Sequence, residues 1–345
     1  MRERLMPILT IAGYIAFYLF AFFFAAYLTF PYERLRDRLV AEFAADQKGR
    51  PSNQRLEIDE LEPYWFTGVR ARGVKVTIAA PAKAAGESTA PTVIEVEELR
   101  ARTGVFAKLL GKTKVNYFVK GFGGEISGTF VDSAAERRIE MDIDDIAVSR
   151  LDALVAAVGL PMAGSMKGEV NLVFPERRAS KGEGQVKLTI TDLSVGDGKA
   201  KIKNTIALPK MNVGELGFDA EVQSGVLKVN KLAASGGDLE IATDGKIQLR
   251  DIPLESVCDL YLRFKFSDAF KGRNETTRTI FGAPGSTAPA LFELDPSIKS
   301  AKRSDGFYGW HMLGNLTTPK FDPFSGNPPG SAPIKAPTPA IAKPK

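Results

Sequence analysis

The chain has 345 residues, of which 44% are hydrophobic and 25% charged, with one cysteine and one histidine. This composition excludes a chain that is disordered throughout. The single Cys258 excludes an intramolecular disulfide framework and a zinc site built from several thiolates. The single His311 excludes sites that need two histidine ligands.

The formal charge of +5 lies at the ends, because residues 1–50 carry +2 and residues 323–345 carry +3. The neutral remainder lacks the basic stripe of nucleic-acid-binding proteins, so no nucleic-acid partner is expected.

The N-terminal segment predicts a membrane anchor. Ile8 to Leu28 is a run of 21 residues without a charge, and as a helix it spans about 32 Å, close to the thickness of the hydrocarbon core. A cleaved signal peptide is the alternative, but its apolar region is usually shorter, and no A-x-A site follows here. The apolar side chains predicted to form the anchor are Ile8, Leu9, Ile11, Ile15, Leu19, Phe22, Phe24 and Leu28. Phe30, Pro31 and Tyr32 are predicted to lie at the interface, where aromatic residues gather.

An amphipathic helix is predicted directly after the anchor, over residues 32–45 within a juxtamembrane segment 31–48. Its apolar residues recur at helical spacing, at Leu35, Leu39, Val40 and Phe43. Two roles stay open for it: packing on the body of the protein, or lying on a membrane or partner surface.

Beyond residue 50 the hydrophobic period changes from 3.6 to 2, which predicts a mainly β body of antiparallel strands with one apolar and one polar face. The alternation slips at Asp144 and Asp145, which indicates a β-bulge. Asp244-Gly245 between alternating runs predicts a hairpin turn. Two short helices are expected, over 104–110 and 149–158. The fold class is therefore one N-terminal transmembrane helix followed by a twisted, curled antiparallel sheet with a few short helices.

Two segments differ from the body. Residues 81–91 are small and polar, which predicts a flexible loop. Residues 323–345 hold seven of the 21 prolines and few large apolar groups, which predicts a disordered tail.

No catalytic constellation is found, and the sequence predicts neither a cofactor nor a metal site. The cluster at Gly121 to Gly128 has Ile126 where a dinucleotide-binding motif needs its last glycine. Cys258 is in phase with Leu260 and Leu262 and should point into the core as an inert thiol. His311, among Phe307, Tyr308 and Trp310, is expected in an aromatic cluster without an acid at ligand spacing.

Several segments resemble known families. LTFPYERLRDRL (Leu28 to Leu39) and the stretch from Gly104 to Phe130 resemble the type II secretion system protein N family in its delta-proteobacterial form. The stretches from Ser224 to Leu249 and from Leu313 to Phe321 resemble the hairpins and closing segment of AsmA-like proteins. The resemblance implies a non-enzymatic, single-pass protein of the bacterial inner membrane with its body in the periplasm. It implies a cytoplasmic N-terminus at 1–7, an anchor at 8–30, a periplasmic β-rich domain at 49–322 and a tail at 323–345.

Two functions follow as expectations. The first is a component of the type II protein secretion system that contacts other subunits through exposed sheet edges. The second is an AsmA-like envelope-biogenesis or lipid-transport protein, with an apolar groove in a curled sheet as its lipid site. The residues predicted to line that groove are Val186, Leu188, Ile190, Leu239, Ile241, Ile247, Leu249, Leu262, Phe264 and Phe266. An open apolar groove favours the second function, and a fully covered apolar face favours the first. An enzyme is a third class, which two converging carboxylates in a pocket would favour.

Overall fold

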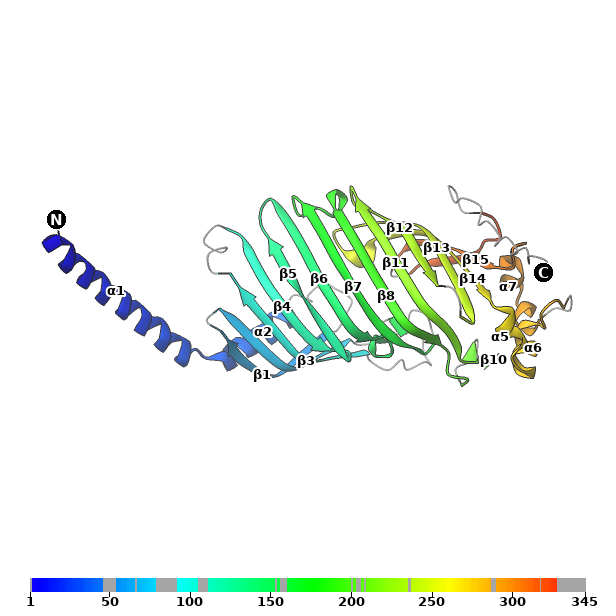
Figure 1. The fold of residues 1–345 in the computed structure, drawn as a ribbon, viewed down its shortest axis with the longest axis horizontal. Coiled ribbons are helices and arrows are strands. Elements are labelled where there is room, and N and C mark those ends of the chain that lie inside the picture. The colour runs from blue at the N-terminus through cyan, green and yellow to red at the C-terminus, as the bar shows by residue number, and fades with distance from the viewer. Residues whose placement is uncertain are drawn as a thin grey trace, which may run out of the picture. The chain divides into compact units, whose positions relative to one another are not determined.

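The computed structural model describes residues 2–45, 54–65, 67–78, 92–104, 111–152, 154–155, 160–199, 201–202, 206–207, 209–234, 237–286, 290–316 and 318–327 (Figure 1). The loop expected at 81–91 and most of the helix expected at 104–110 lie outside the described residues, as does the tail beyond Asn327.

The fold is mainly β, as the alternation predicts. Fourteen strands form one antiparallel sheet in the order β1-β2-β3-β4-β5-β6-β7-β8-β11-β12-β13-β14-β15-β16. The strands are β1 (Gln54–Tyr64), β2 (Gly68–Ile78), β3 (Thr92–Thr103), β4 (Thr113–Gly121), β5 (Gly124–Asp132), β6 (Glu136–Ala147), β7 (Met162–Pro175), β8 (Glu183–Val195), β11 (Met211–Gln223), β12 (Val226–Ala234), β13 (Leu239–Gln248), β14 (Val257–Phe266), β15 (Tyr308–Asn315) and β16 (Lys320–Pro323). A separate two-stranded sheet pairs β9 (Lys201–Ile202) with β10 (Ile206–Ala207).

The chain divides into two compact units. Unit 1 comprises residues 1–105 and 117–121, and unit 2 comprises residues 106–116 and 122–345. Unit 1 contains the helices α1 (Arg2–Thr29) and α2 (Tyr32–Ala45) and the strands β1 to β3. The amphipathic helix predicted over 32–45 is confirmed as α2, which lies against β1, where the Arg36 guanidinium donates to the backbone oxygen of Asp59 at 3.3 Å.

Helix α1 exposes large apolar side chains along its described length. Phe17, Tyr18, Phe20 and Phe22 are each more than 60% exposed, at 63%, 69%, 62% and 68%. Among the residues that the structure describes, no helix combines the length and the apolar character needed to cross a membrane.

Unit 2 carries an apolar face that continues from strand to strand. The register places Ile126 opposite Ile143 and Met141 opposite Val170. It then places Val170 opposite Val186, and Val186 opposite Ala220. Because directly paired residues of neighbouring strands point to the same side, these side chains form rows across the sheet.

Bulges interrupt the rows at a few places. The predicted bulge at Asp144 and Asp145 is confirmed, because the register between β6 and β7 shifts between Ile143 and Ile146 and Asp145 has a φ of 53°. The shift returns Ile146 to the apolar side, where it is 1% exposed.

The hairpin predicted at Asp244-Gly245 is wrong, since β13 continues through both residues. Gly245 is needed for a close approach instead of a turn: a Cβ atom there would lie 2.2 Å from the backbone oxygen of Asp259. The Asp244 carboxylate forms an ion pair with the guanidinium of Arg263 on the neighbouring strand β14. An Asp-Gly pair looks the same in sequence whether the glycine is needed for a tight turn or for the close approach of a neighbouring strand.

The helix predicted over 149–158 is only partly described. Ser149 does not begin it, because Ser149 lies inside the 3-10 helix η1 (Val148–Arg150). A helical hydrogen bond follows from the Val155 N–H to the Leu151 carbonyl at 3.0 Å, and residues 156–159 lie outside the described residues.

Short helices between β14 and β15 cover one end of the apolar face. They are α5 (Asp268–Gly272), α6 (Glu275–Phe281), the 3-10 helix η4 (Leu291–Leu294) and α7 (Pro296–Ala301). Two further 3-10 turns are η2 (Ala179–Lys181) and η3 (Pro253–Glu255). Asn274 caps α6 by accepting from the Thr277 N–H at 2.8 Å while the Thr277 hydroxyl accepts from the Asn274 N–H, so the start of this helix is fixed locally.

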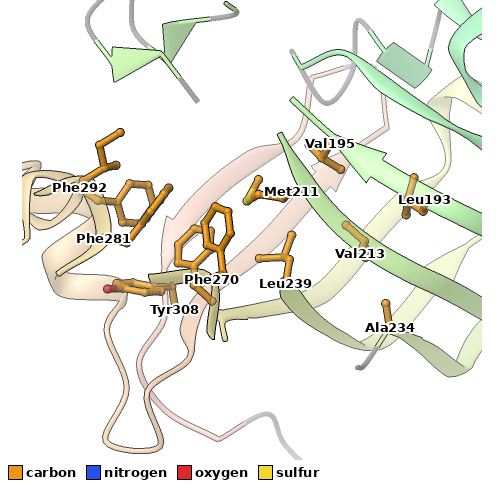
Figure 2. Packing of buried hydrophobic residues seen from close by; sticks show 12 residues of the cluster. Leu193, Val195, Met211, Val213, Ala234, Leu239, Phe270, Phe281, Phe292 and Tyr308 are labelled. Carbon is orange, nitrogen blue, oxygen red and sulfur yellow. The ribbon is translucent and has the colours of Figure 1, made fainter. Parts of the chain in front are cut away.

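The helices contribute aromatic rings to the main buried cluster (Figure 2). Phe270 of α5 is fully buried, and its ring centroid lies 5.3 Å from that of Phe281 of α6. Phe281 in turn lies 4.3 Å from Phe266, the last residue of β14. Ring pairs at these separations stabilise each other beyond simple burial. The cluster therefore fixes the helices on the end of the sheet.

We expect Phe270→Ala to destabilise the protein by about 3–5 kcal/mol, because it leaves a cavity among rings that cannot collapse into it. Urea unfolding of the full chain in detergent measures the change. Leu294→Ala is the matched control, because Leu294 is 64% exposed and its change should stay within about 0.5 kcal/mol. Equal effects of the two variants would contradict the assignment of Phe270 to the core.

Candidate functional site: an apolar groove

A groove of about 650 Å³ opens on the apolar face of unit 2. All sixteen described residues that line it are apolar: Leu154, Leu160, Met162, Ile190, Leu193, Val195, Met211, Leu216, Leu232, Leu239, Ile241, Leu262, Phe264, Phe266, Phe292 and Phe321. Six of them are buried, nine are half-buried, and Phe321 is 54% exposed. The groove is therefore a hollow whose hydrocarbon lining stays partly open to solvent, within the size range of ligand sites.

Strand register builds the groove floor. Ile190 of β8 lies opposite Leu216 of β11, and Leu216 lies opposite Ala234 of β12. Ala234 lies opposite Ile241 of β13, which lies opposite Phe264 of β14. A single row of apolar side chains thus crosses five strands whose residues are up to 74 positions apart in sequence.

The aromatic cluster closes one end of the groove. Phe266 and Phe292 both line the groove and belong to the cluster, with their ring centroids 5.5 Å apart. Figure 2 shows Phe281 and Phe292 from the helical segment facing Met211 and Leu239 from the strands. At the floor, Phe264 stacks on Trp310 of β15 with the ring centroids 5.2 Å apart.

Charge lies on the other face of the same strands. Glu169, Lys187, Asp219 and Lys231 form a row across β7, β8, β11 and β12 in which each residue lies opposite one of the other sign. Such cross-strand pairs stabilise a solvated sheet face. The sheet therefore separates a charged side from a hydrocarbon side, and none of the described side chains that line the groove can donate a hydrogen bond to a ligand.

One half-buried polar group, the Glu293 carboxylate, forms hydrogen bonds at the closed end of the groove. Glu293 of η4 accepts from Lys302 at 2.6 Å and from the Tyr308 hydroxyl at 2.5 Å. Burial alone would raise the pKa of Glu293, but these two donors outweigh it and the net pKa lies below the ordinary value. The pKa of Tyr308 is raised mainly by burial and, to a smaller extent, by the hydrogen bond that its hydroxyl donates to Glu293.

Six of the ten residues predicted for the groove line it, namely Ile190, Leu239, Ile241, Leu262, Phe264 and Phe266. Val186 and Leu188 lie on the same face of β8 but farther along the strand. Ile247 of β13 lies on that face opposite Cys258, and Leu249 follows the end of β13. These four residues are not part of the lining.

The sequence did not point to several lining residues. Leu154 and Leu160 belong to the connection before β7, Phe292 to η4, and Phe321 to the short strand β16. Leu193 and Val195 follow Asp192, whose φ of 51° marks a bulge. The break in alternation at Thr191-Asp192 is the one signal that would have included them.

The predicted anchor residues lie on α1, with Ile15, Leu19, Phe22 and Phe24 exposed by 46–68%. The side chains of Ile8, Leu9, Ile11 and Leu28 lie outside the described part of the structure. Phe30 is exposed, Pro31 separates α1 from α2, and the Phe30 and Tyr32 rings lie 4.9 Å apart.

No protein-family model matches this chain. Searches among curated proteins and among solved structures likewise return no match.

Two residues singled out by their chemistry lie away from the groove lining. Cys258 is fully buried, as predicted, and its thiol donates to the Gly314 carbonyl at 3.0 Å. Burial raises the pKa of this thiol. His311 does lie among aromatic rings, but its ring partners are Tyr261, at a centroid distance of 4.3 Å, and Phe324, at 6.3 Å, and not the sequence neighbours that were expected. The expectation that it has no acid nearby is wrong, because Asp259 lies 2.8 Å from its Nε2 across the strand pair.

Within the described residues, no group of three acidic, cysteine or histidine side chains is placed to hold a metal ion.

We expect Glu293→Gln to lower the free energy of unfolding by about 1.5–3 kcal/mol at pH 7, the range for a hydrogen bond to a charged group. The native pKa of Glu293 is lowered, so its contribution is present above the ordinary value of 4.5 and is lost as the pH falls through the native value. The difference between wild type and Glu293→Gln should therefore shrink below pH 4.5.

Urea unfolding between pH 3 and pH 7 tests this pH dependence, with the exposed Glu255→Gln as control. A difference between wild type and Glu293→Gln that stays constant with pH would contradict the charge-based account.

Proposed function

We propose that this protein is a membrane-anchored, non-enzymatic carrier that holds an acyl chain of a lipid in the groove of unit 2. The observation that supports it is the lining: sixteen apolar residues around about 650 Å³, left partly open to solvent. Exposed continuous hydrocarbon of this kind in a protein body is unfavourable unless a ligand or partner covers it. An acyl chain fits because it needs no hydrogen bonds and gains about 0.8 kcal/mol for each buried methylene group.

The arrangement of the helices favours a carrier over a filled core. The helices α5 and α6 and the turn η4 cover the end near Phe266, while Ile190, Leu216 and Ile241 stay half-buried. The same apolar face continues through β5, β6 and β7 by register. We infer that the sheet curls along this face, since the bulges at Asp145 and Gly214 and between Asp219 and Ala220 increase local twist.

The membrane anchor is part of this proposal. The sequence from Ile8 to Leu28 is uncharged, and the aromatic side chains of α1 are exposed where a bilayer would cover them. By the family resemblance, we infer a single pass through the bacterial inner membrane with the body in the periplasm. A carrier in that place takes part in envelope biogenesis, as AsmA-like proteins are expected to do.

We expect a photo-crosslinking residue at Ile241 to form adducts with phospholipid in cells, because Ile241 lies in the groove floor. The matched control is the same residue at Ala242, which lies opposite Arg263 on the charged face. Mass spectrometry of the purified, irradiated protein identifies the adducts. Adducts at both positions, or at neither, would overturn the acyl-chain proposal.

A component of the type II protein secretion system is the second candidate. Strand β16 supports it: all four of its residues are exposed, and among the described residues only β15 pairs with it. An exposed edge can add a strand from a partner. Here the partners would be other secretion-system subunits in the envelope.

For this second candidate, a photo-crosslinking residue at Lys320 of β16 should give adducts with a secretion subunit, and deletion of the gene should trap secreted enzymes in the periplasm. Glu240, on the charged face of β13, is the control position for the crosslink. Normal secretion in the deletion strain, with a drug-sensitive outer membrane, would exclude this candidate and favour the lipid carrier.

A further inference from the structure

The hairpin that joins β1 and β2 ends in an exposed tryptophan. Trp65 is 63% exposed and has a φ of 55°, in the left-handed region that bulky residues rarely adopt. It follows Tyr64, which pairs with Gly68 as the last pair of the two strands. The turn therefore presents a large apolar ring outward at the extreme end of the hairpin.

The packing of α2 fixes which way this tip points. Arg36 of α2 contacts Asp59 of β1, while Val40 and Ala44, farther along the helix, share a hollow with residues 54–58, farther back along the strand. Helix and strand therefore run antiparallel. The first residue of α2, Tyr32, lies toward the end of β1 that leads to Trp65.

Rise per residue places the tip beyond the start of α2. From Asp59 to Tyr64 the strand advances by about 17 Å, whereas from Arg36 back to Tyr32 the helix covers only about 6 Å. Helix α1 ends at Thr29, and the Tyr32 N–H donates to the Phe30 carbonyl at 2.9 Å. The hairpin tip thus reaches past the level at which the proposed anchor meets α2.

The chemistry of the tip suits a lipid headgroup layer. Tryptophan prefers this layer because its ring is apolar while its N–H can still find an acceptor. The end of β3 lies beside the turn, where the Thr103 N–H donates to the Thr67 carbonyl at 3.2 Å. The adjacent Arg102 lies opposite Gly68 and is exposed, so it can meet anionic headgroups.

We propose that the β1–β2 tip, led by Trp65, rests in the headgroup layer of the bilayer and forms a second attachment beside Phe30 and Tyr32. This inference depends on the proposed anchor. With the anchor as one point and the tip as another, α2 and β1 are held at a fixed angle to the membrane, which a single helix followed by a free body does not provide.

The chain has two tryptophans, which makes the test direct. The full chain carrying Trp310→Phe is inserted into nanodiscs of phosphatidylethanolamine and phosphatidylglycerol doped with brominated phosphatidylcholine. We expect the emission of Trp65 to be blue-shifted, to lose most of its intensity to bromine, and to resist aqueous acrylamide. Bromine near the headgroups should quench more than bromine near the chain ends.

Subtracting the spectrum of the Trp65→Phe chain from that of the wild type gives the same signal without altering Trp310, if Trp310→Phe does not fold. A chain that enters the nanodiscs while Trp65 stays open to acrylamide and insensitive to bromine overturns the proposal and leaves the anchor standing; it would indicate a tip that serves a protein partner. A chain that does not enter the nanodiscs overturns the anchor and with it the tip.

Discussion

The structure depends on one constraint, which is that paired residues in an antiparallel sheet point to the same side. Once Ile190, Leu216, Ala234, Ile241 and Phe264 are in register, their side chains form one hydrocarbon row. A slip of one residue at any strand would turn that strand's apolar set toward the charged face. The alternating charges of Glu169, Lys187, Asp219 and Lys231 on that face oppose such a slip, because a shifted strand would meet the wrong neighbours.

A sheet with one apolar face has to cover it, and the residues that the structure describes cover only part. The insertion between β14 and β15 supplies Phe270, Phe281 and Phe292, which pack on Phe266 and complete a core there. Nearer Ile190 and Leu216, the side chains in the rows of β8 and β11 pack against that core but stay half-buried. The uneven cover is what separates a core from a groove, and this difference is the basis on which we propose a lipid carrier.

Much of the sheet could be predicted from sequence, because a period of two is a local property. Alternation correctly placed Val186, Leu188 and Ile190 on one face, and the slip at Asp144 and Asp145 correctly marked a bulge. The groove was harder, since its lining combines residues far apart in sequence, such as Leu160 and Phe321. Asp259 beside His311 was missed for the same reason, as 52 residues separate them. At Asp244-Gly245 the local signal was misleading, because the glycine is required by the close approach of the neighbouring strand β14 and not by a turn.

The order of strands in the sheet is, apart from the small β9–β10 insertion, the order of strands in the sequence. Each new strand can pair with the one made just before it, so no strand has to wait for a distant partner to be synthesised. Sheets joined through such neighbouring contacts avoid the long loop closures that slow other β proteins. A chain that emerges N-terminus first can therefore assemble progressively outward from β1, which α2 already supports. The helical insertion and β16 come after β14, so the groove gains its closed end only after the strands of its floor have been made.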